Sequence, residues 1–350
     1  MRGLRKYLTP FAPDQSGAVS VLFELGGIVV ICDAGGCTGN VCGFDEPRWH
    51  AMRSAVFSAG LRDMDAILGR DDKLVASLAD AASKIDARFA AVVGTPVPAV
   101  IGTDYRALAR MAERACGLPT ITVDSSGTRL YDDGTRKALS ALVGRFATER
   151  LPREAGRIGV LGAIPLDLGS CSANSVISAL PGAVCYGMGS TLDDVISASS
   201  AERNVVVAPS GLAAARLLEQ RFGTPYQVFD PRFRSEEALQ SLGLSTVAGK
   251  RVLVVHQQVT ANTLRETLLA QGAASVCCAS WFMQLPELTQ EGDRQLAEED
   301  DFSELVSEGG FDLLIADPTL WQLVPGFEGT RVSLPHFALS GKLLEDGEPR

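Results

Sequence analysis

The feature that most constrains the fold is an order of segments that recurs along the whole chain: a short apolar run, a turn with glycine or proline, and a helical pattern. The apolar runs are rich in valine, isoleucine and alanine, as expected for strands that are covered on both faces of a sheet. Strands that alternate with helices predict βαβ units, which place the strands parallel to one another. The sequence therefore predicts an α/β fold of three Rossmann-like domains with parallel sheets.

The recurring order divides the 350 residues into three blocks, as a prior of roughly 100–200 residues per domain allows. We expect domains at 1–150, 151–245 and 246–350, and an amphipathic helical stretch at 62–84. Ligands in such sheets bind at the carboxyl ends of the strands. The expected strands are Gly26–Cys32, Phe89–Gly94, Thr120–Val123, Arg157–Ala163, Ala183–Tyr186, Asn204–Ala208, Tyr226–Phe229, Arg251–His256, Ser275–Ala279, Phe311–Ala316 and Thr330–Leu334.

The charge pattern argues against nucleic acid and membrane surfaces as partners. The formal net charge is −10, and Lys and Arg form no cluster of the kind that binds a phosphate backbone or anionic lipid. The apolar runs are shorter than the roughly 20 residues that span a bilayer. The first residues are basic, but no apolar segment of a signal peptide follows them. We therefore expect a cytoplasmic protein.

Cysteine usage points to one segment of the first block. In a reducing compartment, the 8 cysteines are expected as thiols or ligands rather than as disulfides. Cys32, Cys37 and Cys42 lie close together in the sequence, around a glycine-rich turn. The other five are expected as small buried apolar side chains: Cys116, Cys171, Cys185, Cys277 and Cys278.

The turn after the first strand has the chemistry of an iron–sulfur ligand set. Its glycines let the backbone approach a bound group closely, and free amides there donate hydrogen bonds to sulfide or thiolate. A thiol near a helix N-terminus is also expected to have its thiolate form favoured. These points indicate Cys37, Cys42 and Cys32 as candidate ligands. The spacing matches neither a ferredoxin run nor a zinc knuckle, so a redox thiol, or a glycine turn that merely contains cysteines, remains open.

Several short segments, taken in order, resemble component 1 of nitrogenase and its relatives, which include dark-operative protochlorophyllide reductase and a reductive cyclase of coenzyme synthesis. In that family a proline- and glycine-containing segment leads into a helix. A strand then ends in a His-Gly-x-x-Gly-Cys turn whose cysteine binds the bridging cluster. The resembling segments here are Pro13–Ala18, Cys32–Cys37, Pro96–Asp104, Gly189–Asp194, Asn204–Val207 and Phe222–Tyr226.

The resemblance assigns the family's cluster-ligand position to Cys37, but the chain departs from the family pattern elsewhere. Pro13 and Pro96 stand where the family has its other two cluster cysteines, and Cys32 stands where it has histidine. Ala208 stands where nitrogenase binds its cofactor through cysteine, and the cofactor histidine has no counterpart. The resemblance thus implies a 4Fe–4S cluster, with its nuclearity left open, and no iron–molybdenum cofactor.

The resemblance also implies a function and partners. The chain would be the iron–sulfur subunit of a nitrogenase-like ATP-dependent reductase, acting on a tetrapyrrole or another small molecule. Electrons would come from a separate iron protein related to nitrogenase component 2, since no Walker A motif occurs here. The cluster would be shared in a homodimer or with a paralogue. The alternatives are a non-catalytic cluster or cofactor scaffold of the same fold, and a metal-free α/β binding or glycosyl-transfer protein.

A few further residues are candidates of weaker kind. Asp33 is an oxygen ligand or, more often at such a place, a turn or cap residue. His256 ends a strand and is either a proton donor to substrate or a structural histidine, and His50 could lie behind the cluster. Nothing distinguishes His336. The Gly159–Gly162 turn lacks the full dinucleotide fingerprint, so NAD binding is not expected.

Overall fold

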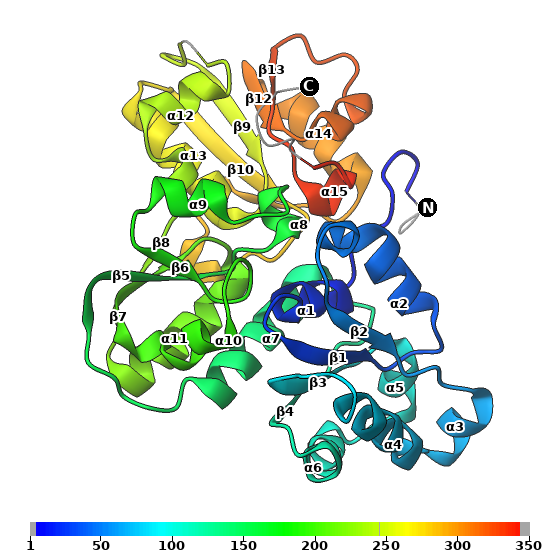
Figure 1. Cartoon of the computed structure of the whole chain (residues 1–350). Coiled ribbons are helices and arrows are strands. Elements are labelled where there is room, and N and C mark those ends of the chain that lie inside the picture. Colours follow the sequence, from blue (N-terminus) through cyan, green and yellow to red (C-terminus); the bar gives the residue numbers. More distant parts are fainter. Residues whose placement is uncertain (1–4, 245, 344–350) are drawn as a thin grey trace.

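The protein, seen here as a computed structural model, is described at residues 5–244 and 246–343. Within these ranges the named strands form three sheets, and every strand pairing in them is parallel (Figure 1). The predicted α/β class with Rossmann-like parallel sheets is therefore confirmed. Each sheet uses one contiguous part of the sequence. The domain boundaries near 150 and 246 fall between the sheets and stay a prediction.

The first sheet has the strand order β2-β1-β3-β4 and is covered on both faces. Its edge strand β2 was not among the expected strands. It is short and partly exposed, so it lacks the apolar run that marks a buried strand. The elements of this part are β1 (Gly27–Ile31), β2 (Ala55–Ser58), β3 (Phe89–Val93), β4 (Thr120–Val123), α1 (Asp14–Leu22), α2 (Gly36–Asn40), η1 (Val41–Asp45), η2 (Pro47–His50), α3 (Asp63–Leu68), α4 (Asp71–Ala82), α5 (Pro96–Ile101), α6 (Tyr105–Cys116) and α7 (Tyr131–Phe146).

The amphipathic stretch expected at 62–84 is two helices rather than one. Helix α3 ends at Gly69, which takes a left-handed φ of +62°, and α4 begins at Asp71. A glycine in this conformation is a common helix terminator because it has no Cβ to oppose a positive φ. As a result α3 projects from the body of the first domain, at the right of Figure 1.

The second sheet has the order β6-β5-β7-β8. Its strands β5 and β7 begin earlier than expected and end before the glycine and proline turns that follow them. The elements are β5 (Glu154–Leu161), β6 (Ala183–Cys185), β7 (Ala201–Val206), β8 (Tyr226–Val228), α8 (Pro165–Leu168), α9 (Asn174–Ala179), α10 (Leu192–Ile196), η3 (Ala198–Ser200), η4 (Pro209–Gly211), α11 (Leu212–Phe222), η5 (Pro231–Phe233) and α12 (Glu236–Ser241).

The third sheet has the order β11-β10-β9-β12-β13. The carboxylate of Glu299, at the start of α14, accepts the backbone N–H groups of Lys6, Tyr7 and Leu8, which ties the N-terminal segment to this part. The elements are β9 (Arg251–Val255), β10 (Ser275–Ser280), β11 (Arg294–Gln295), β12 (Leu313–Ala316), β13 (Thr330–Ser333), α13 (Gln258–Ala270), η6 (Pro286–Leu288), α14 (Glu299–Gly309), η7 (Pro318–Leu323) and α15 (Phe337–Ser340).

Helix α7 joins the first two sheets, because it packs on α1 and β4 on one side and on α11 on the other. The backbones of α7 and α1 approach so closely that a side chain does not fit at two of the contact positions. A Cβ added at Gly134 would lie 1.7 Å from the carbonyl oxygen of Asp14, and one at Gly17 would lie 1.9 Å from that of Tyr131. Both glycines are therefore required by the approach of two backbones.

We expect Gly134→Ala to destabilise the protein by about 3 kcal/mol, because overpacking forces two helix backbones apart. Gly144 lies on the same helix, where an added Cβ would meet only Leu217 at 3.8 Å. Gly144→Ala should instead stabilise by about 0.5–1 kcal/mol through helix propensity. Urea unfolding of both variants measures the two free energies. If Gly134→Ala raised the free energy of unfolding as Gly144→Ala should, the α1–α7 contact would be looser than described.

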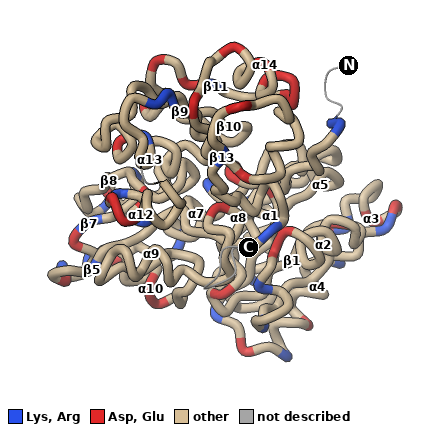
Figure 2. The backbone as a smooth tube through the Cα atoms, turned by 90° about the horizontal axis from the view of Figure 1, so that it is seen from above, with Lys and Arg blue, Asp and Glu red and all other residues tan. Residues whose placement is uncertain are grey.

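Basic and acidic residues are distributed along the whole chain, and several acidic residues lie on α14 (Figure 2). No helix in the described ranges is both long and apolar enough to pass through a bilayer.

Candidate metal centre

The candidate turn begins directly after β1, at the carboxyl edge of the first sheet. Asp33 is buried there, and its carboxylate accepts the backbone N–H of Thr38 at 2.7 Å, the hydroxyl of Thr38 at 3.0 Å and the hydroxyl of Ser58 at 2.6 Å. Both carboxylate oxygens are thus used to hold the start of α2 and the end of β2. Asp33 is a turn residue, the commoner of its two predicted roles.

Cys32 lies on the opposite face of the first sheet from the other two cysteines of the turn. Successive strand residues alternate between the faces of a sheet. Cys32 accordingly shares the core that contains Val30 and Leu74, whereas Cys37 and Cys42 pack against the core on the α1 side. Burial raises the pKa of the Cys32 thiol to about 12. The structure therefore does not bring Cys32 together with Cys37 and Cys42.

Cys37 and Cys42 are half-buried on consecutive helical segments, α2 and the π-helical turn η1. Burial raises the pKa of both thiols. Asp33 adds to the shift at Cys37, against a hydrogen bond with Thr95, and Glu46 adds to it at Cys42. The expectation that the helix end favours the thiolate is wrong for the protein alone, since desolvation and neighbouring carboxylates outweigh it. A bound metal would reverse this balance, because coordination removes the thiol proton.

The space around the turn suits a bound cluster. Added Cβ atoms at Gly35, Gly36, Gly39 and Gly43 would meet no atom within 4 Å, so the backbone is open to an approaching group. The side-chain oxygen of Gln15, at the start of α1, is buried and has no hydrogen-bond partner. An open glycine backbone beside two thiols fits the needs of an iron–sulfur cluster, whose sulfur atoms accept amide hydrogen bonds.

Two prolines that occupy the family's other ligand positions lie beside this turn. Asp14, which follows Pro13, accepts the backbone N–H groups of Ser126 and Gly127 through its carboxylate. A Cβ added at Gly127 would lie 2.5 Å from the Pro96 ring. Asp14, next to Pro13, and Pro96 therefore both contact the segment 126–127, and neither proline offers a ligand atom.

Over residues 5–244 and 246–343, no group of three or more His, Cys, Asp or Glu side chains is arranged to hold a metal ion. One copy of the described chain thus presents two thiols on the α1 side of the sheet, Cys37 and Cys42, rather than a complete ligand set. His50, the nearest histidine in sequence, is exposed at the end of η2.

A second polar cluster lies buried where α7 meets the carboxyl ends of strands from the second and third sheets. The Tyr131 hydroxyl donates to Asp167 at 2.5 Å and lies 3.2 Å from Nε2 of His336. The His336 ring stacks on that of His256 with 4.2 Å between centroids, and its backbone N–H donates to Asp317. We call Tyr131, Asp167, His256 and His336 the junction cluster.

Burial governs the protonation of the junction cluster. It raises the pKa of Asp167 to about 7, against a hydrogen bond from Tyr131, and lowers that of His336 to about 3. Burial also lowers the pKa of His256 well below its usual value. The 3.5 Å contact between His336 and Asp167 is therefore not an ion pair near neutral pH, because the histidine stays neutral.

The sequence predictions missed most of the junction cluster. His256 was given a possible role and His336 was named without one, and the structure shows the two as buried histidines stacked on each other. The signal was available, since Asp167, His256 and His336 each follow a strand closely, and carboxyl ends of strands gather at one edge of a parallel sheet. Tyr131 gave no signal, because it begins a helix.

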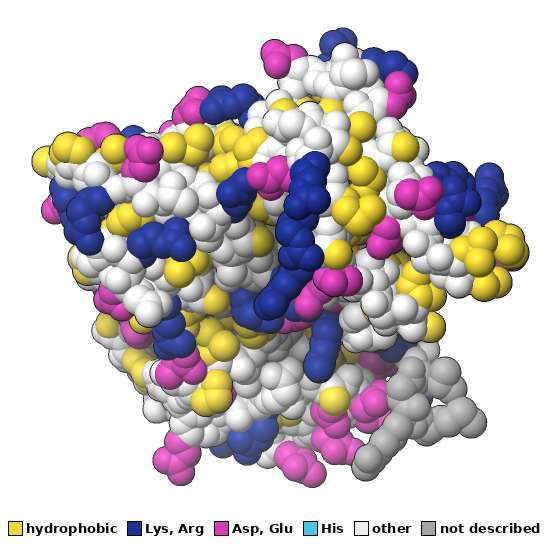
Figure 3. Space-filling view, turned by 90° about the horizontal axis from the view of Figure 1, so that it is seen from below, with side chains coloured by type: hydrophobic (Ala, Val, Ile, Leu, Met, Phe, Trp, Pro, Cys, Tyr) yellow, Lys and Arg dark blue, Asp and Glu magenta, His cyan; other side chains and the backbone are white. Residues whose placement is uncertain are grey.

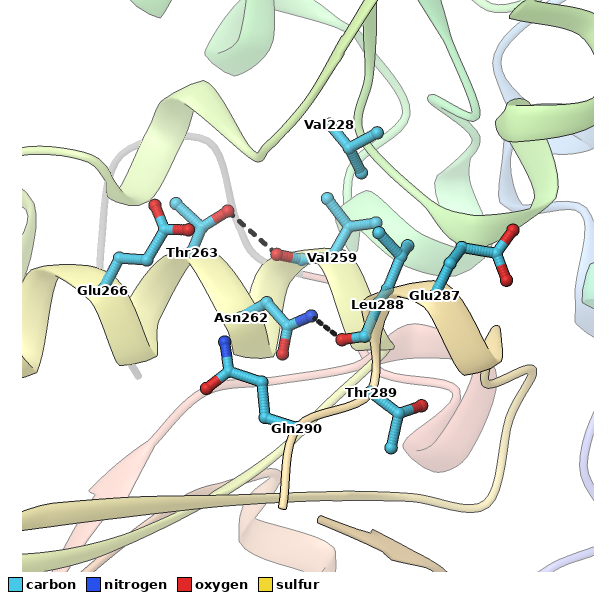
Figure 4. A pocket seen from close by; sticks show the side chains of 9 residues that line it. All are labelled: Val228, Val259, Asn262, Thr263, Glu266, Glu287, Leu288, Thr289 and Gln290. Atoms are coloured by element: carbon cyan, nitrogen blue, oxygen red, sulfur yellow. Dashed lines mark hydrogen bonds between the residues drawn. The ribbon is translucent and has the colours of Figure 1, made fainter. Parts of the chain in front are cut away.

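A separate cavity of about 190 Å³ opens beside α13 (Figure 4). Its polar groups are largely bonded to one another: Asn262 donates to the carbonyl of Leu288, and Thr263 to that of Val259. It contains no cysteine or histidine, so it is not a second candidate for the cluster. Its lining residues are Val228, Val259, Asn262, Thr263, Glu266, Glu287, Leu288, Thr289 and Gln290.

Comparison with known proteins identifies the family. The sequence model described as nitrogenase component 1 type oxidoreductase matches residues 15–241, which is more than half of the chain. The chain belongs to this family. The cysteine turn and the whole second sheet lie within the matched region.

Two curated relatives match about half of this chain at low sequence identity. The chain is 27% identical over 180 residues to the nitrogenase iron–molybdenum cofactor biosynthesis protein NifE of Clostridium pasteurianum, a match that covers 49% of this chain and 38% of the relative. It is 26% identical over 188 residues to NifE of Klebsiella pneumoniae, covering 49% and 41%. The matched part thus spans about two fifths of the relatives' own length.

Solved structures show the same fold over almost the whole chain. Nitrogenase Cp1 at pH 6.5 superposes with a TM-score of 0.70 at 12% identity, over 96% of this chain and 87% of the other. Nitrogenase Cp1 at pH 5 gives a TM-score of 0.66 at 16% identity, over 96% and 85%. At this identity the likeness establishes the fold of this nitrogenase component 1 type protein.

Proposed function

We propose that the chain is the iron–sulfur subunit of a nitrogenase-like ATP-dependent reductase. The observation that supports this most is the pair Cys37 and Cys42 on an open glycine turn, at the carboxyl end of a parallel strand, in a member of this family. A cluster bound there would supply one-electron chemistry at low potential. The protein's own residues hold the turn, since Asp33 accepts the backbone N–H of Thr38, and the glycines of the turn leave open space beside the two thiols.

We propose that two chains share one cluster. Cys37 and Cys42 of one copy, with the same two residues of a second copy or of a paralogue, make the four thiolates that a 4Fe–4S cluster generally takes. Cys32 was also predicted as a ligand. In the described conformation, Cys32 belongs to the core on the other face of the sheet, and it would reach this site only if the end of β1 changed conformation. The shared cluster is therefore proposed without Cys32.

Exposed apolar side chains beside the turn support burial by a second copy. Phe44 is 75% exposed, and Trp49 and Met52 follow it on the same surface segment with 37% and 42% exposed. Aromatic residues and methionine are enriched in the centres of protein interfaces. A two-fold axis near this segment would cover these side chains and bring the two turns together, as an isologous contact requires.

The electron donor is proposed to be a separate ATP-hydrolysing iron protein related to nitrogenase component 2. Apolar side chains are exposed on the lobe formed by α3 and on α5, and Figure 3 shows hydrophobic atoms at the tip of a lobe on the right. Helix α5 begins next to Thr95, the hydrogen-bond partner of Cys37, so a protein docked on α5 would lie near the cluster. The exposed residues are Met64, Ile67, Leu68, Val100 and Ile101.

A second candidate function is favoured by the NifE matches, since both relatives are cofactor biosynthesis proteins. A scaffold of this kind would hold a cluster or a cofactor precursor without turning over a substrate. The same turn and the same ligands would serve both functions, so that only electron transfer separates them.

Two measurements on anaerobically purified protein test the proposal. Iron analysis with low-temperature electron paramagnetic resonance (EPR) should find a cluster, and a colourless, iron-free protein after reconstitution would rule out both candidate functions. The cluster protein is then mixed with a nitrogenase iron protein, MgATP and dithionite. Reduction of the cluster that depends on MgATP supports the reductase, and a cluster that only dithionite reduces supports the scaffold.

A further inference from the structure

The cysteine turn has little packing of its own. Four of the residues from Gly35 to Gly43 are glycines with open space around them, and Val41 is the buried side chain within η1. Something outside the turn must therefore set its position. Asp33 holds its start. At its end, one anchor is Asp45, whose carboxylate accepts from Ser16 of α1 at 2.6 Å and from Asn40 at 2.7 Å.

The second anchor is a buried guanidinium directly after the turn. Arg48 is the largest fully buried side chain among the described residues. It forms a two-point contact with the Glu46 carboxylate, from Nε at 2.7 Å and from a terminal nitrogen at 2.6 Å. It also donates to Glu24 at 2.7 Å and to the backbone carbonyl of Ser20 at 2.6 Å. The guanidinium thus joins the end of the turn to α1.

Through Glu24, the guanidinium is also linked to a loop of the second sheet's part of the chain. The other carboxylate oxygen of Glu24 accepts the backbone N–H of Gly189, in the segment between β6 and α10. Glu46 also accepts from the hydroxyl of Ser20, and its backbone N–H donates to Val41 and closes η1. We call Arg48, Glu46 and Glu24 the arginine clamp. It fixes the exit of the cysteine turn at a point shared by the first two domains.

The charges of the clamp matter to an anionic cluster. Glu46 is buried and Glu24 is partly buried, with one buried cation between them, and Glu46 acts on Cys42 electrostatically. Without the guanidinium, the carboxylates of Glu46 and Glu24 would both lose their cation, and the one on Glu46 acts on Cys42. Arginine suits the position because its planar fork makes a two-point contact with Glu46 while another nitrogen donates to Glu24, a fixed geometry that an ammonium group does not offer.

We propose that Arg48 is a positioning residue for the cluster: through Glu46 and Glu24 it holds the turn Gly36–Asp45 and balances the buried negative charge beside Cys42. This inference rests on the proposed cluster at the turn. The clamp does not touch the cluster, and its effect is carried by the backbone of η1 and by the electric field.

The test uses Arg48→Lys, the isosteric Glu46→Gln, and a matched control. The control is Asp293→Asn, which breaks an equally buried arginine–carboxylate pair with Arg265 in the third domain. In cluster-free protein, hydrogen exchange at the amides of 36–45 should be on the order of tenfold faster in Arg48→Lys than in wild type. It should be unchanged in Asp293→Asn. Equal exchange in the two variants would overturn the proposal.

In cluster-loaded protein, Arg48→Lys should lose iron and show a heterogeneous EPR signal. Glu46→Gln keeps the guanidinium and removes one negative charge, so that the midpoint potential should shift to a more positive value. An unchanged or more negative potential contradicts the charge-balancing role, and Glu46→Gln carries the test if Arg48→Lys does not fold. An iron-free wild type would instead refute the cluster itself, while the exchange experiment still decides whether the clamp holds the turn.

Discussion

Cys37→Ala is expected to abolish cluster binding, with iron content and the EPR signal of the reduced protein both reduced to background. Cys37 is half-buried on a turn whose glycines are open, the resemblance assigns the family's ligand position to it, and it is one of two thiols that a single chain offers there. A shared 4Fe–4S cluster would lose two of its four thiolates at once, because both copies carry the substitution. Cys42→Ala should have the same effect for the same reason.

The control for this experiment is Cys116→Ala. Cys116 is also a half-buried thiol, but it lies at the end of α6, away from the turn. The Cys116→Ala protein should keep its full iron content. If Cys37→Ala retains its iron and its spectrum, Cys37 is not a ligand and the proposed site is wrong. Cys32→Ala should retain the cluster as well, because Cys32 faces the opposite core.

Asp167→Asn is expected to change how stability depends on pH. Burial raises the pKa of Asp167 to about 7, so the folded protein keeps a proton that the unfolded chain loses near the ordinary value. Between these two pKa values the wild-type carboxyl makes the protein less stable as the pH rises. The slope is about 1.4 kcal/mol per pH unit for one group. The amide keeps an acceptor for the Tyr131 hydroxyl and has no proton to lose.

The difference in unfolding free energy between Asp167→Asn and wild type should therefore grow in favour of the variant by about 2 kcal/mol from pH 5 to pH 7, and then level off at higher pH. His336 and His256 act in the opposite direction, since their lowered pKa values remove stability as the pH falls. They are present in both proteins, so the difference isolates the carboxyl.

Guanidinium unfolding at pH 5, 6, 7 and 8 makes this measurement. Asp193→Asn is the control, because Asp193 is exposed, pairs with Arg88 and has a lowered pKa that keeps it charged over this range. Its difference from wild type should not vary with pH. A constant difference for Asp167→Asn would show that the carboxyl is ionised throughout and that the junction cluster is more hydrated than its burial suggests.

The fold was largely predictable because apolar strand runs and helical patterns alternate throughout the chain. Strands such as β1, β3 and β9 were expected within one or two residues of their ends. The edge strands β2 and β11 were missed, since they are exposed and short and carry no apolar run. The division of the stretch 62–84 depended on the conformation of Gly69, which composition alone does not give.

The candidate site was predictable in part, and the parts that failed depend on three-dimensional neighbours. The turn and Cys37 follow from local sequence, as does the turn role of Asp33. The face on which Cys32 lies depends on the register of β1, which a cysteine count ignores. The raised pKa of Cys42 depends on Glu46 and on burial, and the arginine clamp depends on Glu24 from another helix.

Native mass spectrometry of the anaerobically purified protein tests the central claim most directly, because it reports the number of chains and the bound cluster in one spectrum. The shared-cluster account predicts a species of two chains with one 4Fe–4S cluster, and monomers without iron after treatment with a chelator. The same protein carrying Cys37→Ala should give only cluster-free species. A monomer that carries a complete cluster, or a wild-type protein that never binds iron, would contradict the account.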